Sequence, residues 1–315
     1  MSVTLAELDR FEACRPRLAA IAYRLLGSAS EAEDAVQDAF LRWQSADRDR
    51  IEVPEAWLTK VLTNLCLNQL TSARARRETY VGEWLPEPVL AGDPMLGPAD
   101  TVEQRESVSF AVLTLMERLT PVERGVYVLR EAFGYPHREI AEILELTEAS
   151  SQQIFHRAKK HLADGKARKQ IDETEARKIV EEFLAAATGG SVAPLVELLT
   201  EHAVAVGDGG GKIPARTRPF EGATAVAKFL WGLFRPAESK RKLLGGSPEV
   251  YAWTANGGPA AVAVLDGRVV GIMCLEVGED GIAAFRNQVN PDKLERATAV
   301  WATIDHGEPL MRAAF

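Results

Sequence analysis

Residues 28–77 constrain the fold of this chain most, because two apolar stripes with helical spacing follow each other there. In SASEAEDAVQDAFLRW (28–43), apolar side chains recur at steps of three and four residues, which predicts a helix that buries one face. Ser30, with Glu33 three residues later, predicts the start of this helix as a capping box. A second stripe in PEAWLTKVLTNLCLNQL (54–70) predicts a second helix with one buried side.

The polar faces of these two helices differ in charge. The polar residues on one side of the first helix are acidic: Glu31, Asp34 and Asp38. The polar residues of the second helix are spaced by four positions and are followed by basic ones: Lys60, Asn64, Asn68, Arg74, Arg76 and Arg77. An acidic face alone is usually a solvated surface. An acidic helix beside a polar and then basic helix is typical of a module that contacts a protein and a nucleic acid together.

The two segments resemble the core of bacterial extracytoplasmic-function (ECF) sigma factors. EAEDAVQDAFLRW is similar to the helix that docks on RNA polymerase. The resemblance implies that the polymerase-binding residues are Asp34, Gln37, Asp38, Phe40 and Leu41. AWLTKVLTN is similar to the helix that engages the melted −10 promoter element, with QSADRDRIEV (44–53) as a loop that accepts an extruded base. The implied −10 DNA-binding residues are Lys60, Asn64, Asn68, Arg74, Arg76 and Arg77.

Length and composition indicate the number of domains and the class of protein. A chain of 315 residues with 46% hydrophobic content is expected to form about two or three domains. The net charge of −8 argues against tight binding of duplex DNA by the chain alone. No apolar run reaches about eighteen residues and the N-terminus is charged and polar, so we expect a cytoplasmic protein without membrane contact. The three cysteines lack a CxxC pair and predict reduced thiols without a metal.

A proline-rich linker is predicted for residues 79–104, and a second helical domain for residues 105–165. Within the linker, WLPEP (84–88) is unusually apolar for a loop, so Trp84 and Leu85 are expected to pack against a partner. The segment GYPHREIAEILELTEASSQQIFHRAKKHL (134–162) has the outline of a helix-turn-helix. Six basic residues between positions 156 and 170 favour phosphate contact over a merely solvated helix end.

By resemblance, this second domain binds the −35 promoter element. The implied DNA-binding residues are Ser150, Gln152, Gln153, His156, Arg157 and Lys160, of which the last two lie near phosphates. Glu145 occupies the turn position where relatives usually have glycine. A left-handed backbone at a non-glycine residue costs on the order of 1 kcal/mol. Either the turn differs from that of the relatives, or it is slightly strained.

The pattern changes after residue 170. Helices are expected at residues 175–187, 192–199 and 222–234. Strands are expected at residues 203–206, 241–244, 250–254, 260–265, 269–277 and 282–289. Gly257-Gly258, Asp266-Gly267 and Asp280-Gly281 are predicted to form hairpin turns between the last four strands. Helices followed by an antiparallel sheet predict an α+β domain.

Two short motifs of this domain and one of the linker are considered together. DGGGK (208–212) and NPDKL (290–294) each follow a predicted strand, and a glycine triplet alone is more often a flexible turn than a phosphate cradle. Together with WLPEP, they resemble signatures of the sigma factors that carry a fused SnoaL-like domain. The resemblance implies a SnoaL-like cone over residues 172–295, followed by a tail at 296–315. The implied regulatory residues are Trp84, Leu85, Pro86, Asp208, Gly209, Gly210, Gly211, Lys212, Asn290, Pro291, Asp292, Lys293 and Leu294.

The prediction is a multidomain protein with two all-α sigma domains, region 2 (1–78) and region 4 (105–165), and an α+β cone. It binds core RNA polymerase and the −10 and −35 elements of promoter DNA, is regulated in cis by the cone, and has no cofactor or catalytic residue. The sequence does not decide whether the cone binds a small-molecule ligand. Two alternatives are a helix-turn-helix regulator that works without polymerase, in which the acidic helix has no role, and a SnoaL-type enzyme with a DNA-binding arm. A pull-down with core polymerase separates these classes.

Overall fold

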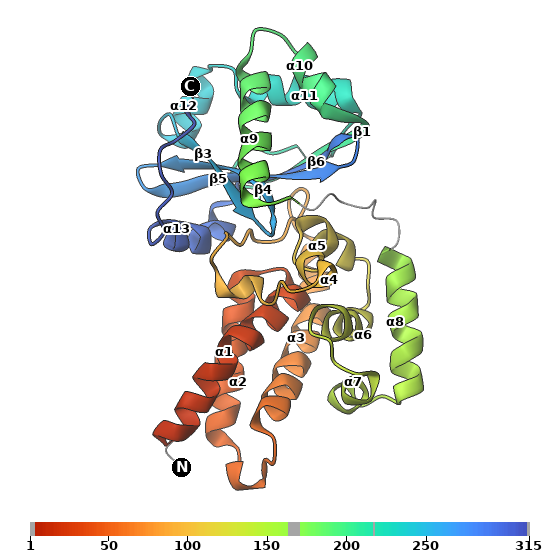
Figure 1. Cartoon of the computed structure of the whole chain (residues 1–315). Coiled ribbons are helices and arrows are strands. Elements are labelled where there is room, and N and C mark those ends of the chain that lie inside the picture. The colour runs from red at the N-terminus through yellow and green to blue at the C-terminus, as the bar shows by residue number, and fades with distance from the viewer. Residues whose placement is uncertain (1–3, 163–170, 217, 314–315) are drawn as a thin grey trace. The chain divides into compact units, whose positions relative to one another are not determined.

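The chain forms two units that interleave along the sequence. A computed structural model describes residues 4–162, 171–216 and 218–313, without the side chains of residues 73–78 and 173. The first unit comprises Met1–Thr79 and Gly92–Gly165. The second comprises Tyr80–Ala91 and Lys166–Phe315, so part of the predicted linker belongs to the C-terminal unit (Figure 1).

Three helices that pack against one another open the first unit: α1 (Leu5–Leu26), α2 (Ala29–Ser45) and α3 (Pro54–Glu78). Gly27 has a left-handed backbone and ends α1, so only Ser28 remains to start α2. The Ser28 hydroxyl accepts a hydrogen bond from the Glu31 N–H, and the predicted cap at Ser30 is therefore wrong. Alanines on the buried face of α2 allow close helix packing around Trp43.

The part of this unit's second half that the structure describes contains five α-helices and a π-helical turn. They are α4 (Val102–Glu106), α5 (Phe110–Met116), α6 (Pro121–Tyr127), the turn η3 (Val128–Ala132), α7 (His137–Leu144) and α8 (Glu148–Leu162). Short 3₁₀ turns lie at η1 (Arg48–Arg50) and η2 (Pro94–Leu96). Between α7 and α8, Glu145 has φ 58° and ψ 45°. The left-handed turn is therefore kept with a non-glycine residue, and it is the strained alternative that holds.

Two buried arginines join the two halves of the first unit. Arg24 of α1 donates to the Ser107 hydroxyl at 2.8 Å and to the Leu96 carbonyl at 2.6 Å. Arg124 of α6 donates to the Arg24 carbonyl at 3.3 Å and forms an ion pair with Glu117 at 2.6 Å. Burial lowers the pKa of Arg24 to about 10 and that of Arg124 to about 9, so both remain protonated near neutral pH. Because buried guanidinium groups need such partners, these contacts hold the two halves together.

A seven-stranded sheet forms the second unit, in the order β2-β1-β6-β5-β4-β3-β7. The strands are β1 (Leu199–Asp208), β2 (Phe220–Glu221), β3 (Glu249–Ala255), β4 (Gly258–Leu265), β5 (Arg268–Gly278), β6 (Gly281–Gln288) and β7 (Met311–Arg312). Neighbours are antiparallel except β1 and β6, which are parallel. The helices are α9 (Glu173–Thr188), α10 (Ala193–Leu198), α11 (Ala223–Leu233), α12 (Glu238–Leu244) and α13 (Glu295–Trp301), with a 3₁₀ turn η4 (Pro291–Lys293).

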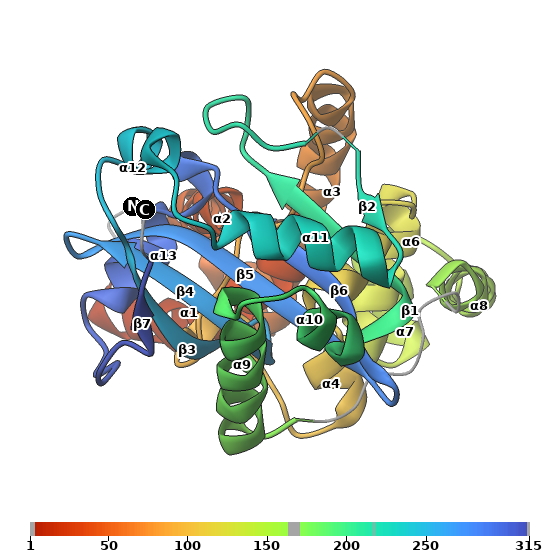
Figure 2. The same cartoon turned by 90° about the horizontal axis from the view of Figure 1, so that it is seen from above.

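The core of this unit lies between the sheet and two helices. α9 packs on β3 and β4, and α11 packs on β1 (Figure 2). Phe183 of α9 is fully buried with its ring centroid 5.0 Å from that of Phe285 on β6. The adjoining strands and α11 add further buried apolar side chains. The result is the α+β arrangement that the sequence predicts.

Two local expectations differ from the structure. Residues 241–244, predicted as a strand, end helix α12, because the Glu238–Lys242 pair supports a helix and Gly245 closes it with a left-handed backbone. The first hairpin turn is Asn256-Gly257, with φ 52° and 71°, rather than Gly257-Gly258. A two-residue turn of this type needs positive φ at both central positions, and asparagine followed by glycine meets that need.

Candidate polymerase, promoter and linker sites

Helix α2 presents the candidate polymerase-binding residues. Asp34, Gln37 and Asp38 are exposed, and Leu41 is 53% exposed although it is apolar. Phe40 is half-buried, and its ring centroid lies 4.7 Å from that of Phe11 on α1. Acidic side chains beside an unburied leucine form a surface suited to binding another protein. Phe40 also contributes to packing within the unit.

The candidate −10 residues follow one another along α3. Lys60 and Asn64 are half-buried, whereas Asn68 is exposed. Lys60 forms an ion pair with Glu145 at 3.2 Å. Arg74, Arg76 and Arg77 belong to the last turns of α3, but their side chains lie outside the described residues.

A depression of about 540 Å³ adjoins the start of α3. It is lined by residues of the loop between α2 and α3, among them Arg50, Glu52 and Val53, together with Trp57. The loop that is predicted to accept an extruded base lines this depression. Apolar, basic and acidic side chains line it together.

Most of the candidate −35 residues are exposed along α8. Gln152, Gln153, His156, Arg157 and Lys160 point away from the buried side of the helix, which carries Ser151, Ile154 and Ala158. Ser150 is half-buried, and its N–H donates to the Thr147 hydroxyl at 3.1 Å. Ser150 therefore takes part in starting the helix. Amide and basic side chains on one exposed face can bind base edges and phosphates.

The linker segment around WLPEP is built into the second unit. Residues 85–90 are all buried. Leu90 forms a β-bridge with Ala255 at the end of β3, and the Ala91 N–H donates to the Thr254 carbonyl at 3.0 Å. The Val89 N–H donates to the side chain of Asn256 at 3.0 Å. The expected partner of the apolar linker is therefore the sheet of the cone.

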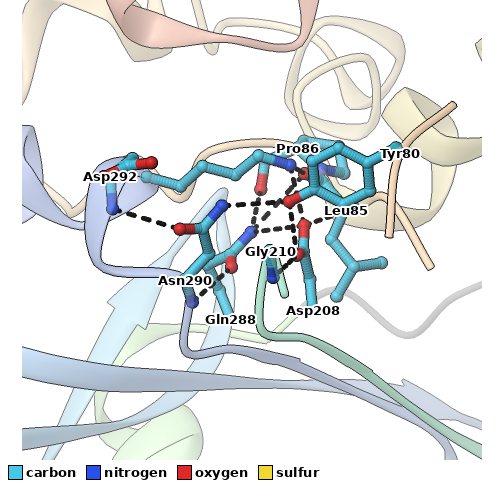
Figure 3. A network of polar contacts seen from close by, with 9 residues as sticks. Tyr80, Leu85, Pro86, Asp208, Gly210, Gln288, Asn290 and Asp292 are labelled. Atoms are coloured by element: carbon cyan, nitrogen blue, oxygen red, sulfur yellow. Dashed lines mark hydrogen bonds and ion pairs between the residues drawn. The ribbon is translucent and has the colours of Figure 1, made fainter. Parts of the chain in front are cut away.

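Asp208 is the centre of the polar contacts between linker and cone (Figure 3). Its buried carboxylate forms an ion pair with Lys293 at 2.7 Å. It also accepts hydrogen bonds from the Leu85 N–H at 2.9 Å, from the Tyr80 hydroxyl at 2.7 Å and from Gln288 at 3.3 Å. Lys293 donates in addition to the Leu85 carbonyl at 2.6 Å. We call Asp208, Gln288, Asn290 and Lys293 the linker site.

Aromatic rings of the linker complete this site. The Lys293 ammonium lies 4.8 Å from the centroid of the Tyr80 ring and 4.4 Å from that of Trp84. Asn290 donates to the Tyr80 hydroxyl at 2.9 Å. Burial, followed by the hydrogen bond to Asp208, raises the pKa of Tyr80 above its usual value. A cation between two rings and a carboxylate is well stabilised away from water.

The glycines of DGGGK permit close packing of NPDKL. A Cβ at Gly209 would overlap the Ile213 carbonyl, and one at Gly210, which has φ 59°, would overlap the amide of Asn290. Gly211 is also left-handed, and Lys212 pairs with Asp292 at 2.7 Å on the surface. The run is thus a turn packed beneath Asn290. Of the other motif residues, Pro291 is exposed, Leu294 is buried, and the buried Pro86 accepts at its carbonyl from Gln288 at 3.2 Å.

Known proteins share both the sequence and the fold. Residues 10–76 match the Sigma-70 region 2 family and residues 109–162 match the Sigma-70 region 4 family. The chain is 36% identical over 294 residues to the ECF RNA polymerase sigma factor SigJ of Mycobacterium tuberculosis, covering 91% of this chain and 93% of that protein. This chain belongs to the ECF RNA polymerase sigma factors.

Two further comparisons agree. The sigma factor is 29% identical over 293 residues to the probable ECF RNA polymerase sigma factor SigI of M. tuberculosis, covering 90% of this chain and 93% of that protein. The crystal structure of M. tuberculosis SigJ matches with a TM-score of 0.70 at 33% identity, covering 91% of this chain and 97% of that chain. The predicted fold, two helical sigma domains and a SnoaL-like α+β domain, is confirmed. Among the helices that the structure describes, none is long and apolar enough to cross a membrane.

Several residues of this sigma factor escaped the sequence analysis. Tyr80 lies just before WLPEP, and an aromatic residue there was a usable signal. Gln288 ends β6 without any motif to mark it. Arg24 and Arg124 sit in helices whose spacing predicts burial of apolar residues only. Because a buried charge depends on distant partners, its position cannot be recognised from local pattern.

Proposed function

We propose that this sigma factor binds core RNA polymerase through the exposed face of α2 and directs it to specific promoters. The observation that carries the proposal is the exposure of Asp34, Asp38 and Leu41 on a helix whose other side is anchored in region 2. Family membership supplies the partner, since sigma factors bind core polymerase and promoter DNA. A protein that works with polymerase on promoter DNA acts in the bacterial cytoplasm.

A pull-down with core polymerase tests this proposal. Asp38→Arg should abolish binding and leave the thermal midpoint almost unchanged, because an exposed side chain contributes little to folding. Asp9→Arg is the matched control, since Asp9 is also exposed and helical but lies on α1. Equal binding by both variants would remove the docking role of α2.

Promoter recognition is divided between two helices in this proposal. Asn64 and its neighbours on α3 contact the melted −10 strand beside the depression near Trp57. Gln152, Gln153 and the basic residues of α8 contact the −35 element in the major groove. The net charge of −8 fits a protein whose DNA affinity is provided mainly through the polymerase.

We propose further that the cone regulates transcription in cis through the linker. The supporting observation is that Leu85 is only 1% exposed and is bonded at both its N–H and its carbonyl by the linker site. A regulator on the same chain has a high effective concentration, so it can restrain the sigma regions without tight contacts.

A catalytic role is less well supported than a structural one. The Asp208 carboxylate is held by Lys293, Tyr80, Gln288 and the backbone, so its lone pairs are occupied rather than aimed at a substrate. General acid–base catalysis requires a group that can reach a substrate proton. We therefore propose that this part of the cone holds the linker and catalyses no reaction.

Two truncations test regulation in cis. If the cone only restrains, removing everything after about residue 170 should leave transcription with saturating polymerase at least as high as in the full chain. If the cone also assists polymerase binding, that truncation should be inactive, and a shorter cut just before Asn290 should be hyperactive, because it removes Lys293 from the linker site. Identical activity of all three proteins would contradict regulation in cis.

A further inference from the structure

The face of α3 that carries the −10 residues is in contact with region 4. Lys60 of α3 pairs with Glu145, the residue that follows α7, at 3.2 Å. Their side chains are 41% and 78% exposed, so the pair lies at the edge of a contact between the two regions. α3 packs against both α6 and α7 (Figure 1).

A second contact lies two turns further along α3. A Cβ at Gly125 of α6 would lie 3.3 Å from the Cδ2 atom of Leu67 and 3.6 Å from the Cδ1 atom of Leu144. A side chain at this position would require Leu67 to shift by a few tenths of an ångström, so α6 and α3 approach each other closely here. Leu67, Gly125 and Leu144 therefore form an apolar contact between the regions.

Asn64 lies between these two contacts. Residues 60, 64 and 67 are spaced by four and three positions, so Lys60, Asn64 and Leu67 share one face of α3. Since the first and last of them touch region 4, the face that carries Asn64 is directed at α6 and α7. Asn64 is accordingly half-buried, whereas Asn68, a turn later, is exposed.

Other contacts hold the same arrangement. The Thr59 and Tyr135 hydroxyls are 3.3 Å apart, and the Arg17 guanidinium lies 5.1 Å from the centroid of the Tyr135 ring. Arg24 and Arg124 form the buried hydrogen bonds across the two regions described above. The two regions are therefore in contact at several separate points.

We propose that the free sigma factor is self-inhibited, because region 4 covers the −10-binding face of region 2 and Glu145 holds it there through Lys60. The proposal rests on the proposed function of α3 in binding the −10 strand. It also accounts for Glu145 at a left-handed position that glycine would occupy without strain. A glycine there could not reach Lys60, so the strained residue is retained for its carboxylate. Binding to polymerase separates the regions and uncovers Asn64.

Zero-length cross-linking tests the arrangement in the full chain. A carbodiimide, which joins a lysine amine to a carboxylate in contact with it, should produce a Lys60–Glu145 link in the free protein. The Lys159–Glu131 pair, 2.9 Å apart within region 4, is the internal standard. In the complex with core polymerase the Lys60–Glu145 link should be lost and the standard retained.

DNA binding without polymerase tests the consequence. Glu145→Gln should tighten binding of a fluorescent random-sequence single-stranded oligonucleotide by about two- to fivefold, the change expected for loss of one exposed ion pair. Glu142→Gln makes the same change of charge on α7, where Glu142 is exposed and pairs with Arg138 of its own helix. This control should bind as the unaltered chain does.

The outcomes separate the inference from the function on which it rests. Absence of the Lys60–Glu145 link in the free protein, or equal gains for Glu145→Gln and Glu142→Gln, would overturn the self-inhibition. Persistence of the link in a transcriptionally active complex would overturn it as well. Failure to bind polymerase would instead defeat the proposed function, and the two experiments without polymerase would still decide whether region 4 covers α3.

Discussion

The ion pair between Asp208 and Lys293 is the contact whose loss should most affect the linker. The Asp208 side chain is 0% exposed, so Lys293→Met would leave a buried carboxylate without its cation. Breaking a buried pair on one side costs about 3–5 kcal/mol. Tyr80, Gln288 and the Leu85 N–H continue to donate to the carboxylate, so the lower end, about 3 kcal/mol, applies.

The cost should appear as release of the linker, because water reaches Asp208 once Leu85 and Tyr80 move away. About 3 kcal/mol corresponds to an increase of roughly a hundredfold in the population of the released linker. Cleavage after Glu83 by a glutamate-specific protease reports this population when the linker opens and closes faster than it is cut. Lys293→Met should therefore be cleaved roughly a hundredfold faster than the unaltered chain.

Lys212→Met is the matched control. Lys212 also pairs with an aspartate, Asp292, across the same two motifs, but both side chains are more than half exposed (57% and 60%). Exposed pairs contribute about 0–1 kcal/mol, so cleavage should rise by at most about fivefold. Combining Lys293→Met with Asp208→Asn should recover part of the protection, since the uncompensated charge is gone. Equal cleavage of the Lys293 and Lys212 variants would refute the argument.

Three further predictions concern other parts of the molecule. Asn64→Ala should reduce open-complex formation with little effect on affinity for the duplex −35 element. Gln152→Ala should weaken −35 binding, at a cost of about 1–3 kcal/mol of discrimination at one base pair, with little effect on open-complex formation. If both variants impaired the same step, the assignment of α3 to the −10 element and α8 to the −35 element would be contradicted. Glu145→Gly should raise the free energy of unfolding in urea by up to about 1 kcal/mol, because glycine adopts the left-handed turn without strain, and a decrease would show that the ion pair outweighs the strain. The pKa of Tyr80 is raised in the folded chain, so its contribution to stability is present below the usual tyrosine pKa of about 10 and is lost as pH rises through the folded value. Above a pH of about 10, the urea midpoint of the unaltered chain should therefore fall more steeply than that of Tyr80→Phe.

Local pattern was sufficient for most helices and most strands of this chain. The helix stripe of α2, the helix α8 and the strands β4 to β6 each have their signal within one short segment, and all are present in the structure. Periodicity works because a buried face repeats with the geometry of the element itself. Where the pattern was short it failed, as at residues 241–244, whose helical signals, Glu238 and Gly245, lie outside the four residues considered.

The residues of the candidate surfaces could be predicted, but whether another part of the chain packs against them could not. Exposure of Asp38 on α2 and of Gln152 on α8 follows from spacing, because polar residues on one side of an amphipathic helix face water. Half-burial of Asn64 does not follow, because α3 is in contact with α6 and α7, which belong to another region of the chain. A pattern within one helix carries no information on what packs against its polar side.

The linker shows most clearly what the sequence determines and what only the tertiary structure determines. The sequence by itself determined that Trp84 and Leu85 need an apolar partner, and motif resemblance joined WLPEP to DGGGK and NPDKL. Only the tertiary structure decided the contacts, since Leu85 meets Asp208 across 123 residues and Lys293 across 208. Which buried carboxylate pairs with which amine depends on strand order and on the parallel pairing of β1 with β6, which brings the ends of these two strands together. Such pairings arise from packing between distant elements, and no local rule of the chain specifies them.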